Sequence, residues 1–435
     1  MAFKSKITRR ALVKCGLASA GLPVVSKLIG SAVEVQAEAK AKSDPKTKND
    51  PSFAAIPGQV GGQDICGAYD VDPNWPKPLS SLTGDENWTW GSGEGVFAEN
   101  PDRVFILQRG ELPNIKRPKE TDLPQLGPSL TFPIGRLPWR DATSASPPGP
   151  LDGPNHGTEN VDWRWQHCIV SVNSKGDIIE SWPEWDKMLR RPHAIYINPY
   201  DKDKYVWLVD DYRHAIFKFT HDLKKLVQTI GTPNEHGSDG THFYRPTYLS
   251  WLPDSTMFVA DGYVNTRVAK FDKNGKFIMD WGQKGTPPNE TRPGYFNGVH
   301  GLGIDLPSER VFVNDRNNHR IQVFDTNGKF LNQWRVGDPP SDVHIILVTA
   351  DRHLWAFDRG TNKMIKYDLE GHLLHSWGTW GDFPGGFWGV HGMHVDQESN
   401  LYVAEVDNGR AQKFIPRKGA NPAMVIGPGV KPVWS

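Results

Sequence analysis

The amino-acid sequence predicts an all-β fold, a six-bladed β-propeller. The first observation is the composition: 43 glycines, 35 prolines and 17 tryptophans among 435 residues suit short strands joined by turns better than a helical bundle. The second is a loose repeat through the second half of the chain, with a period of roughly 40–50 residues. The third is that each copy of the repeat can be divided into four short strands, which is the content of one propeller blade.

The first 39 residues are expected to be a twin-arginine signal peptide. Residues 8–14 contain the pair Arg9 and Arg10, and a weakly apolar stretch with small-residue cleavage sites follows. This stretch is well short of the ~20 residues that a transmembrane helix needs. We therefore expect a periplasmic or secreted protein that is exported by the twin-arginine pathway. Residues 40–84 are expected to form a linker and an N-terminal extension, since they begin with a polar, charged stretch.

The propeller is expected to occupy residues 85–435. Strands near residues 95–107 and 168–182 supply the first blade, and a Pro-rich insertion at about 111–160 is expected to cover one face of the disc. Five further blades run from Arg191 to about Gly427. In each of them an apolar, β-branched run ends at an acidic residue, and a turn and an alternating strand follow. These acidic residues are Asp210, Asp261, Asp315, Asp358 and Glu405.

The charge balance limits the kinds of partner. Lys plus Arg and Asp plus Glu both number 50, so the formal net charge is zero. A nucleic-acid or anionic-membrane partner would favour a basic excess, so we expect neither, and we expect a monomer. After removal of the signal peptide, Cys66 and Cys168 remain. They are compatible either with one disulfide or with two unrelated thiols.

Histidines recur at one position of the repeat. His193, His300 and His391 precede the acidic residues of their blades by similar distances, in the similar contexts Pro-His-Ala, Val-His-Gly and Val-His-Gly. If the upstream blade is the first, these blades are the second, fourth and sixth, about 120° apart around the axis. Three imidazoles that converge from such directions leave one side of a metal ion open. We expect zinc, although copper, cobalt or iron(II) would also accept this set.

A fourth histidine complicates this pattern. His344 occupies the same position in the fifth blade, where it could be a hydrogen-bond donor to one of the metal ligands, a fourth ligand or a structural residue.

Two more residues are candidates for chemistry. Arg109 ends a strand of the first blade where other blades carry an acid, and it could bind a substrate carboxylate or pair with a neighbouring acid. Tyr263 lies in the turn after Asp261 and could act as a general base or only pack.

With these residues assembled, the chain resembles the peptidyl-α-hydroxyglycine α-amidating lyases, a branch of the NHL-repeat propellers. The resemblance is carried by Val259-Ala260-Asp261-Gly262-Tyr263-Val264-Asn265-Thr266-Arg267 and by Gln108-Arg109-Gly110. It implies that His193, His300 and His391 bind zinc, that Tyr263 is catalytic and that Arg109 binds substrate. It also implies a reaction that splits a C-terminal α-hydroxyglycine into a peptide amide and glyoxylate.

One departure concerns the residue after the third histidine. The family carries an aspartate there that contributes to catalysis and to a structural calcium site, whereas this chain has Gly392. The resemblance therefore leaves a structural calcium doubtful.

The leading hypothesis is a metal-dependent lyase that acts on a carbinolamide with a carboxylate. The alternatives are a non-catalytic NHL propeller that binds a protein or a glycan, and a metal-dependent hydrolase or lactonase on the same fold.

Overall fold

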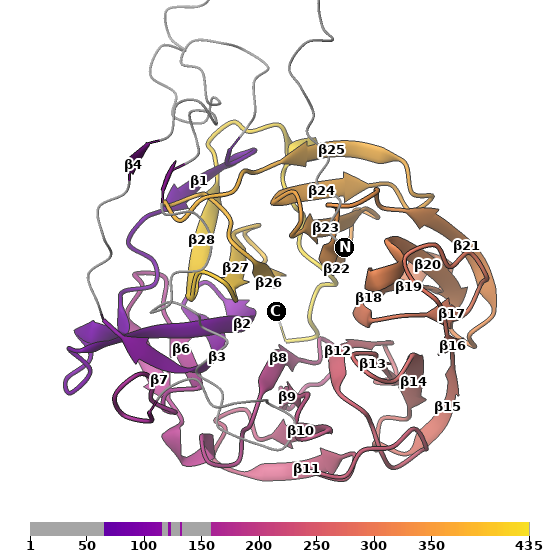
Figure 1. Cartoon of the computed structure of the whole chain (residues 1–435), viewed down its shortest axis with the longest axis horizontal. Helices are drawn as coiled ribbons and strands as arrows, with labels where there is room; N and C mark the ends of the chain where they lie inside the picture. Colours follow the sequence, from indigo (N-terminus) through magenta and orange to yellow (C-terminus); the bar gives the residue numbers. More distant parts are fainter. Residues whose placement is uncertain (1–64, 115–120, 123–130, 133–157, 435) are drawn as a thin grey trace, which may run out of the picture.

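Six four-stranded β-sheets are arranged as blades around a central axis in the computed structural model of the chain (Figure 1). The structure describes residues 65–114, 121–122, 131–132 and 158–434. The prediction of an all-β, six-bladed propeller is confirmed. The expected signal peptide at residues 1–39 lies outside the described residues.

The strands of blades one to three follow one another along the chain, from the axis outwards. Blade one consists of β2 (Trp88–Asn100), β3 (Arg103–Pro113), β6 (Ile169–Val172) and β7 (Ile178–Ser181). Blade two consists of β8 (Pro192–Ile197), β9 (Val206–Asp210), β10 (Ala215–Phe219) and β11 (Leu226–Ile230). Blade three consists of β12 (Pro246–Trp251), β13 (Met257–Asp261), β14 (Arg267–Phe271) and β15 (Phe277–Trp281).

The remaining blades repeat this order, except at the outer edge of the last one. Blade four consists of β18 (Val299–Asp305), β19 (Arg310–Asp315), β20 (Arg320–Asp325) and β21 (Phe330–Arg335). Blade five consists of β22 (Val343–Val348), β23 (Leu354–Asp358), β24 (Lys363–Tyr367) and β25 (Leu373–Trp377). Blade six consists of β26 (Val390–Val395), β27 (Leu401–Glu405), β28 (Arg410–Pro416) and, outermost, β1 (Tyr69–Asp72).

Smaller elements connect the blades. The pairs β4 (Thr121–Asp122) with β5 (Thr131–Phe132) and β16 (Gln283–Lys284) with β17 (Tyr295–Phe296) form two-stranded sheets. Short 3₁₀ helices are η2 (Leu79–Ser81), η6 (Pro183–Trp185), η7 (Leu306–Ser308), η8 (Arg316–Asn318) and η9 (Pro422–Met424). No helix in the described part of the chain is long and apolar enough to cross a membrane.

The propeller begins earlier than the sequence predicts. Residues 69–72, assigned to an extension that ends at residue 84, form β1 and pair antiparallel with β28, from Tyr69 opposite Pro416 to Asp72 opposite Lys413. The last blade is therefore closed by a strand from the start of the chain, which joins the two ends of the disc. At the insertion, β3 continues to Pro113, and most residues up to 157 lie outside the described residues, including those expected to cover one face.

The burial of the strands explains the repeat in the sequence. A middle strand such as β13 is buried along its whole length because neighbouring blades cover both of its faces, so it is continuously apolar up to its terminal acid. The outermost strand β15 alternates between partly buried and exposed residues. The terminal acids are buried, and three of them bind an arginine of the next strand: Asp261 with Arg267 at 2.8 Å, Asp315 with Arg320 at 2.8 Å, and Glu405 with Arg410 at 2.7 Å.

The turn glycines and the tryptophans of the repeat pack against each other between blades. Gly328 (φ 79°) lies so close to Trp281 of the preceding blade that a Cβ would come within 2.8 Å of its ring. Gly371 (φ 97°) lies even closer to the ring of Trp334. The Asn-Gly and Glu-Gly turns therefore need glycine both for the left-handed backbone and for the approach of the indole.

Candidate functional site

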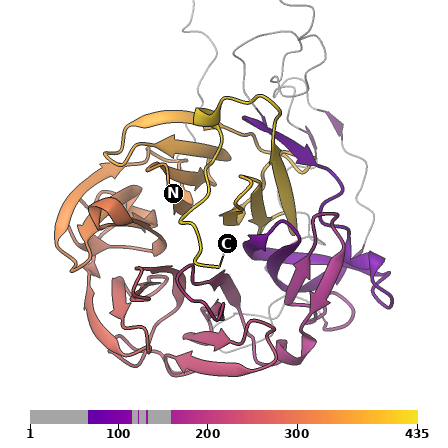
Figure 2. The same ribbon diagram turned by 180° about the vertical axis from the view of Figure 1, so that it is seen from behind.

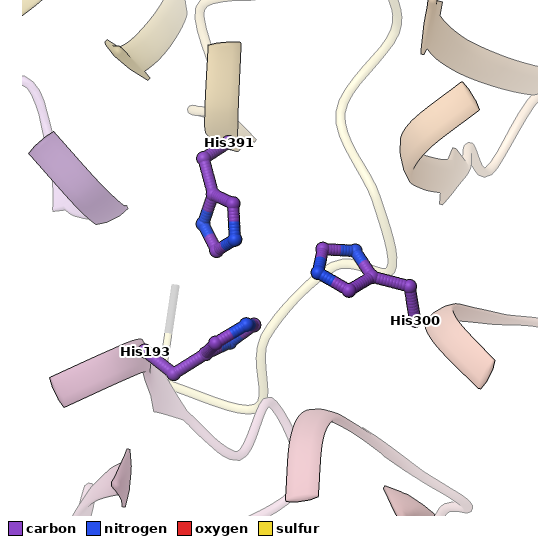
Figure 3. A group of neighbouring side chains, drawn as sticks. All are labelled: His193, His300 and His391. Carbon is purple, nitrogen blue, oxygen red and sulfur yellow. The ribbon is translucent and has the colours of Figure 1, made fainter. Parts of the chain in front are cut away.

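Three histidines meet near the axis at one end of the central channel. His193, His300 and His391 each lie near the start of an innermost strand, on β8, β18 and β26 of blades two, four and six. One ring nitrogen of each lies within 4.8 Å of those of the other two (Figure 3). The structure thus brings together the three histidines that the spacing of the repeat singled out.

A local irregularity in each blade directs these side chains. The pairing of the innermost strand with its neighbour shifts register between Pro192 and Ala194, and again between Val390 and Gly392. A similar shift follows Val299 in blade four. In blades two and six the histidine is the one residue that the shift leaves unpaired, and in blade four the unpaired residues are His300 and Gly301. A β-bulge re-aims the side chain of its extra residue, so the same device in three blades points three imidazoles at one place.

The Nε2 atoms of the three rings converge on the hydroxyl of Tyr263. The distances from this oxygen are 3.1 Å to His193, 3.0 Å to His300 and 3.5 Å to His391. All three imidazoles are buried, with at most 3% of their surface exposed. Tyr263, which follows β13, is only partly buried and forms the outward side of the group.

Hydrogen bonds at the other ring nitrogens fix two of the tautomers. The Nδ1–H of His300 donates to the backbone carbonyl of His344 at 2.6 Å, and the Nδ1–H of His391 donates to the carbonyl of Glu94 at 2.8 Å. Since a carbonyl only accepts, the proton is on Nδ1 and the lone pair is on Nε2. The Nδ1 of His193 is buried and has no hydrogen-bond partner within the described parts of the chain.

The surroundings keep the three imidazoles neutral. Burial is the largest cause that lowers the pKa of each, and the positive charge of nearby arginines adds to it: that of Arg109 and Arg191 beside His193, and that of Arg316 beside His300. Neutral rings with converging Nε2 lone pairs are the donor set of a transition metal with three protein ligands, so these residues fit such an ion.

His344 is not part of this converging set. Its Nε2 lies 3.2 Å from Nη1 of Arg316, and its Nδ1 lies 3.4 Å from Asp342. The imidazole therefore links a carboxylate to a guanidinium, while its backbone carbonyl orients His300. Of the three roles that the sequence left open for His344, the contacts favour that of a residue that positions its neighbours.

Two arginines that the sequence analysis missed flank Tyr263. The guanidinium of Arg245 lies 4.6 Å from the centre of the Tyr263 ring, and that of Arg316 lies 5.4 Å from it. Arg245 is held by Asp211, to which its Nε donates at 2.7 Å. A signal was present in the sequence, because Asp211 and Arg316 both directly follow the acidic residue of their blades. That position faces the histidine end of the channel.

Arg109 is more deeply buried than the sequence suggested. Only 2% of it is exposed, its Nη1 lies 3.0 Å from Glu94, and its Nη2 lies 3.8 Å from Asp211. Glu94 also accepts a hydrogen bond from Ser92 at 2.6 Å. Arg109 therefore pairs with internal acids, which is the second of the two roles that the sequence left open for it.

The place of the missing family aspartate has no room for a side chain. A Cβ on Gly392 would lie 2.8 Å from Cα of Gly95 and 2.9 Å from the backbone nitrogen of Val96. Strand β2 thus lies directly against this glycine, which gives a physical reason for the departure from the family.

Two other candidates from the sequence and the fold are less suited to chemistry. Cys66 and Cys168 do not form a disulfide, so the alternative of two separate thiols holds.

Asp85, Glu111 and His167 also bring ligand atoms together, but the guanidinium of Arg164 already pairs with both carboxylates. The guanidinium balances one of the two negative charges, and the hydrogen bond with Glu111 at 2.7 Å raises the pKa of His167, so the group is paired within the protein.

Comparison with known proteins agrees with this fold. Residues 296–324 match the NHL repeat. The chain is 30% identical over 263 residues to NHL repeat-containing protein 3 of Mus musculus, which covers 55% of this chain and 71% of that protein. The chain belongs to the NHL-repeat family.

Within this NHL-repeat family, the relatives include amidating enzymes. The chain is 38% identical over 236 residues to peptidyl-glycine alpha-amidating monooxygenase B of Xenopus laevis, covering 52% of this chain and 26% of that protein. It is 29% identical over 260 residues to peptidyl-alpha-hydroxyglycine alpha-amidating lyase 1 of Drosophila melanogaster, covering 55% and 47%. The chain thus spans about a quarter of the length of the first of these relatives and about half that of the second.

Proposed function

We propose that this protein is a metal-dependent lyase that cleaves the C–N bond of a carbinolamide and releases an amide and glyoxylate. The observation that carries the proposal is the convergence of three neutral imidazole Nε2 atoms on the hydroxyl of Tyr263. The similarity to proteins named as amidating lyases supports the same reaction class.

In this proposal His193, His300 and His391 hold a divalent metal ion, for which zinc is the first choice. Such an ion would supply Lewis-acid chemistry at the oxygen of the substrate hydroxyl. The burial of the three rings excludes water from their side of the site, and their hydrogen bonds to backbone carbonyls hold them in place.

Tyr263 is the residue placed to move a proton. In the reaction the substrate hydroxyl loses its proton, the C–N bond breaks, and the nitrogen takes up a proton to become the amide. The carbon that carried the hydroxyl becomes the aldehyde of glyoxylate. The oxygen of Tyr263 faces the point where the three histidines meet, so in its phenolate form it can accept the first proton.

The carboxylate of the substrate needs a cation within reach. Arg245 and Arg316 are partly exposed and lie on the Tyr263 ring, whereas Arg109 is buried between Glu94 and Asp211. We therefore assign the binding of the substrate carboxylate to Arg245 and Arg316. Arg109 then has the role of holding Glu94 and Asp211 in position.

The test compares wild type with Tyr263→Phe on an N-acyl-α-hydroxyglycine, with glyoxylate release as the measurement. We expect release by the wild type and a loss of about 10²-fold or more in the variant, since general acid–base groups contribute about that much. Metal content, measured by elemental analysis, should stay the same. Tyr295→Phe, which removes a hydroxyl at β17, is the matched control and should keep full turnover. If metal-loaded wild type releases no glyoxylate, the lyase proposal is wrong.

A further inference from the structure

The far half of the central channel contains a second chamber, of about 170 Å³. It is formed by residues of all six innermost strands, four of which (β8, β18, β22 and β26) carry a histidine near their start. Its walls include Phe97 of β2, Trp251 of β12, Leu302 of β18, Val348 of β22 and Met393 of β26. The chamber therefore shares the axis with the histidine site but lies farther along it.

The C-terminal segment covers this chamber. The amide of Ala350 in blade five donates to the carbonyl of Pro428 at 3.0 Å, and the amide of Val433 donates to the carbonyl of Pro199 in blade two at 2.9 Å. Between these two points the segment crosses the disc and ends near its centre, as seen from both sides (Figures 1 and 2). Val430 and Trp434 are among its residues that line the chamber.

Tyr248 separates the chamber from the histidine site. Its hydroxyl donates to the backbone carbonyl of His391, and its ring stands edge-on to His193 and His300, with ring centres 5.0 Å apart in both cases. The same side chain is part of the chamber wall. A molecule in the chamber would thus contact Tyr248 rather than the converging nitrogens.

The walls offer no counter-charge for an ionic ligand. Glu99 is the one carboxylate among the described lining residues, and no lysine or arginine is among them. Glu99 is already paired with Lys204 at 2.8 Å, with His221 at 2.8 Å and with Arg103 at 3.0 Å. A charged ligand would lose its hydration without gaining a partner.

The wall contains neutral hydrogen-bond donors, of which His394 is the most closely defined. Nδ1 of His394 accepts the backbone N–H of Ala98 at 3.1 Å, and burial lowers the pKa of His394 to about 4. The ring is therefore neutral at neutral pH and carries its proton on Nε2. The ring also packs on Phe97, with centres 4.1 Å apart. Tyr200 and Trp434 also line the chamber, and the hydroxyl of one and the indole nitrogen of the other are buried without a hydrogen-bond partner in the described parts of the chain. The chamber therefore combines aromatic walls with neutral donors that a ligand acceptor can use.

We infer that this chamber is a binding site for a small, neutral, apolar molecule that carries one hydrogen-bond acceptor, of about the size of a substituted benzene ring. An apolar cavity of about 150 Å³ is sufficient to hold benzene, so the volume fits a ligand of this class. The inference does not depend on the proposed lyase activity, because Tyr248 divides the two sites.

The experiment uses the metal-loaded full-length protein and the probe 4-fluoroacetophenone, followed by ¹⁹F NMR. We expect saturable binding with a dissociation constant below about 1 mM, as good contacts for a ligand of this size allow. The isosteric hydrocarbon 4-fluorocumene, which lacks the acceptor, should bind about fivefold more weakly, the value of one neutral hydrogen bond. The anion 4-fluorobenzoate should not compete with the ketone.

Two variants locate the binding. Leu302→Phe fills the chamber and Trp434→Ala opens its cover outside the blades, and each should weaken the binding of the ketone at least tenfold. Leu374→Phe on the exposed outer strand β25 is the control and should leave it unchanged. The inference is overturned if the ketone does not bind, if both variants bind it as the wild type does, or if 4-fluorobenzoate displaces it.

Discussion

At the scale of single residues, the site depends on which side chains the register shifts of the innermost strands direct toward the axis. The innermost strand of blade two shifts register beside His193, that of blade five shifts between Val343 and Ile345 beside His344, and that of blade six shifts beside His391. The innermost strand of blade four shifts beside His300 in the same way, so four histidines share one backbone device. What distinguishes His344 is its neighbours: Arg316 and Asp342 engage its ring nitrogens, so its Nε2 is occupied.

The first prediction separates these two kinds of histidine. His300→Ala should lose most of the bound metal, because a set of two imidazoles binds such an ion far more weakly than a set of three. His344→Ala should retain it. Elemental analysis of the two purified variants at equal concentration provides the comparison. Equal loss of metal in both would show that His344 is a ligand after all.

The second prediction concerns Arg109. Its removal leaves Glu94 and Asp211 buried without this partner, so Arg109→Ala should lower the free energy of unfolding by about 3–5 kcal/mol. The exposed pair of Arg335 with Asp338 is the control, and Arg335→Ala should cost at most about 1 kcal/mol. Denaturant titration measures both. A change of less than 1 kcal/mol for Arg109→Ala would mean that the buried ion pairs do not stabilise the fold.

The sequence could predict only part of this site. The three histidines could be predicted because each lies at a similar distance in sequence before the acidic residue of its blade. Arg245 and Arg316 were harder to predict: Arg316 has a fixed position directly after the acidic residue of its blade, but only the fold shows that both arginines reach the ring of Tyr263. The burial of Arg109 depends on Glu94, which lies in another strand of the same blade.

At the scale of elements, the sequence predicts the individual blades well. It does not predict how the disc is closed, that is, which strand completes the last blade. Turn glycines such as Gly328, and tryptophans such as Trp281, repeat visibly because each contact recurs between neighbouring blades. Strand β1 has only four residues, and its partner β28 lies at the opposite end of the chain. A segment this short gives no periodic signal, so its pairing could not be read from the local pattern.

The third prediction tests this closure. Tyr69 of β1 is fully buried, contacts Trp377 and Phe414, and accepts a hydrogen bond from the amide of Ile426 at 2.7 Å. Tyr69→Ala should lower the free energy of unfolding by about 3–5 kcal/mol, as for other large buried side chains.

The matched control for the closure is Tyr69→Phe. It keeps the ring and loses only the hydroxyl, so it should cost about 1 kcal/mol. Denaturant unfolding, followed by tryptophan fluorescence, distinguishes the two variants. If Tyr69→Ala were no more costly than Tyr69→Phe, β1 would not contribute to holding the last blade.

At the scale of the whole molecule, the central channel organises the protein into two ends with different chemistry. One end combines the histidines with Tyr263 and arginines, and the other is an apolar chamber under the C-terminal segment. Buried titratable groups in different parts of the propeller respond to pH in opposite directions. Burial raises the pKa of Asp186 to about 6, whereas burial lowers that of His394 to about 4. The pH dependence of the unfolding free energy is therefore a sum of contributions from several groups. The contribution of one group is measured by replacing that residue.

The last prediction isolates His394. In the unfolded chain its pKa is near 6.5, and in the folded protein it is about 4. Above pH 6.5 the ring is neutral in both the folded and the unfolded state, so the difference in pKa has no effect on stability. Between pH 6.5 and 4 the unfolded state takes up a proton that the folded state does not, so stability falls as the pH falls. His394→Asn keeps an acceptor for the amide of Ala98 but cannot be protonated. Between pH 7 and 4 the variant should therefore lose about 2 kcal/mol less unfolding free energy than the wild type, as measured by urea titration at each pH. Parallel curves for the two proteins would show that His394 is not kept neutral by the fold.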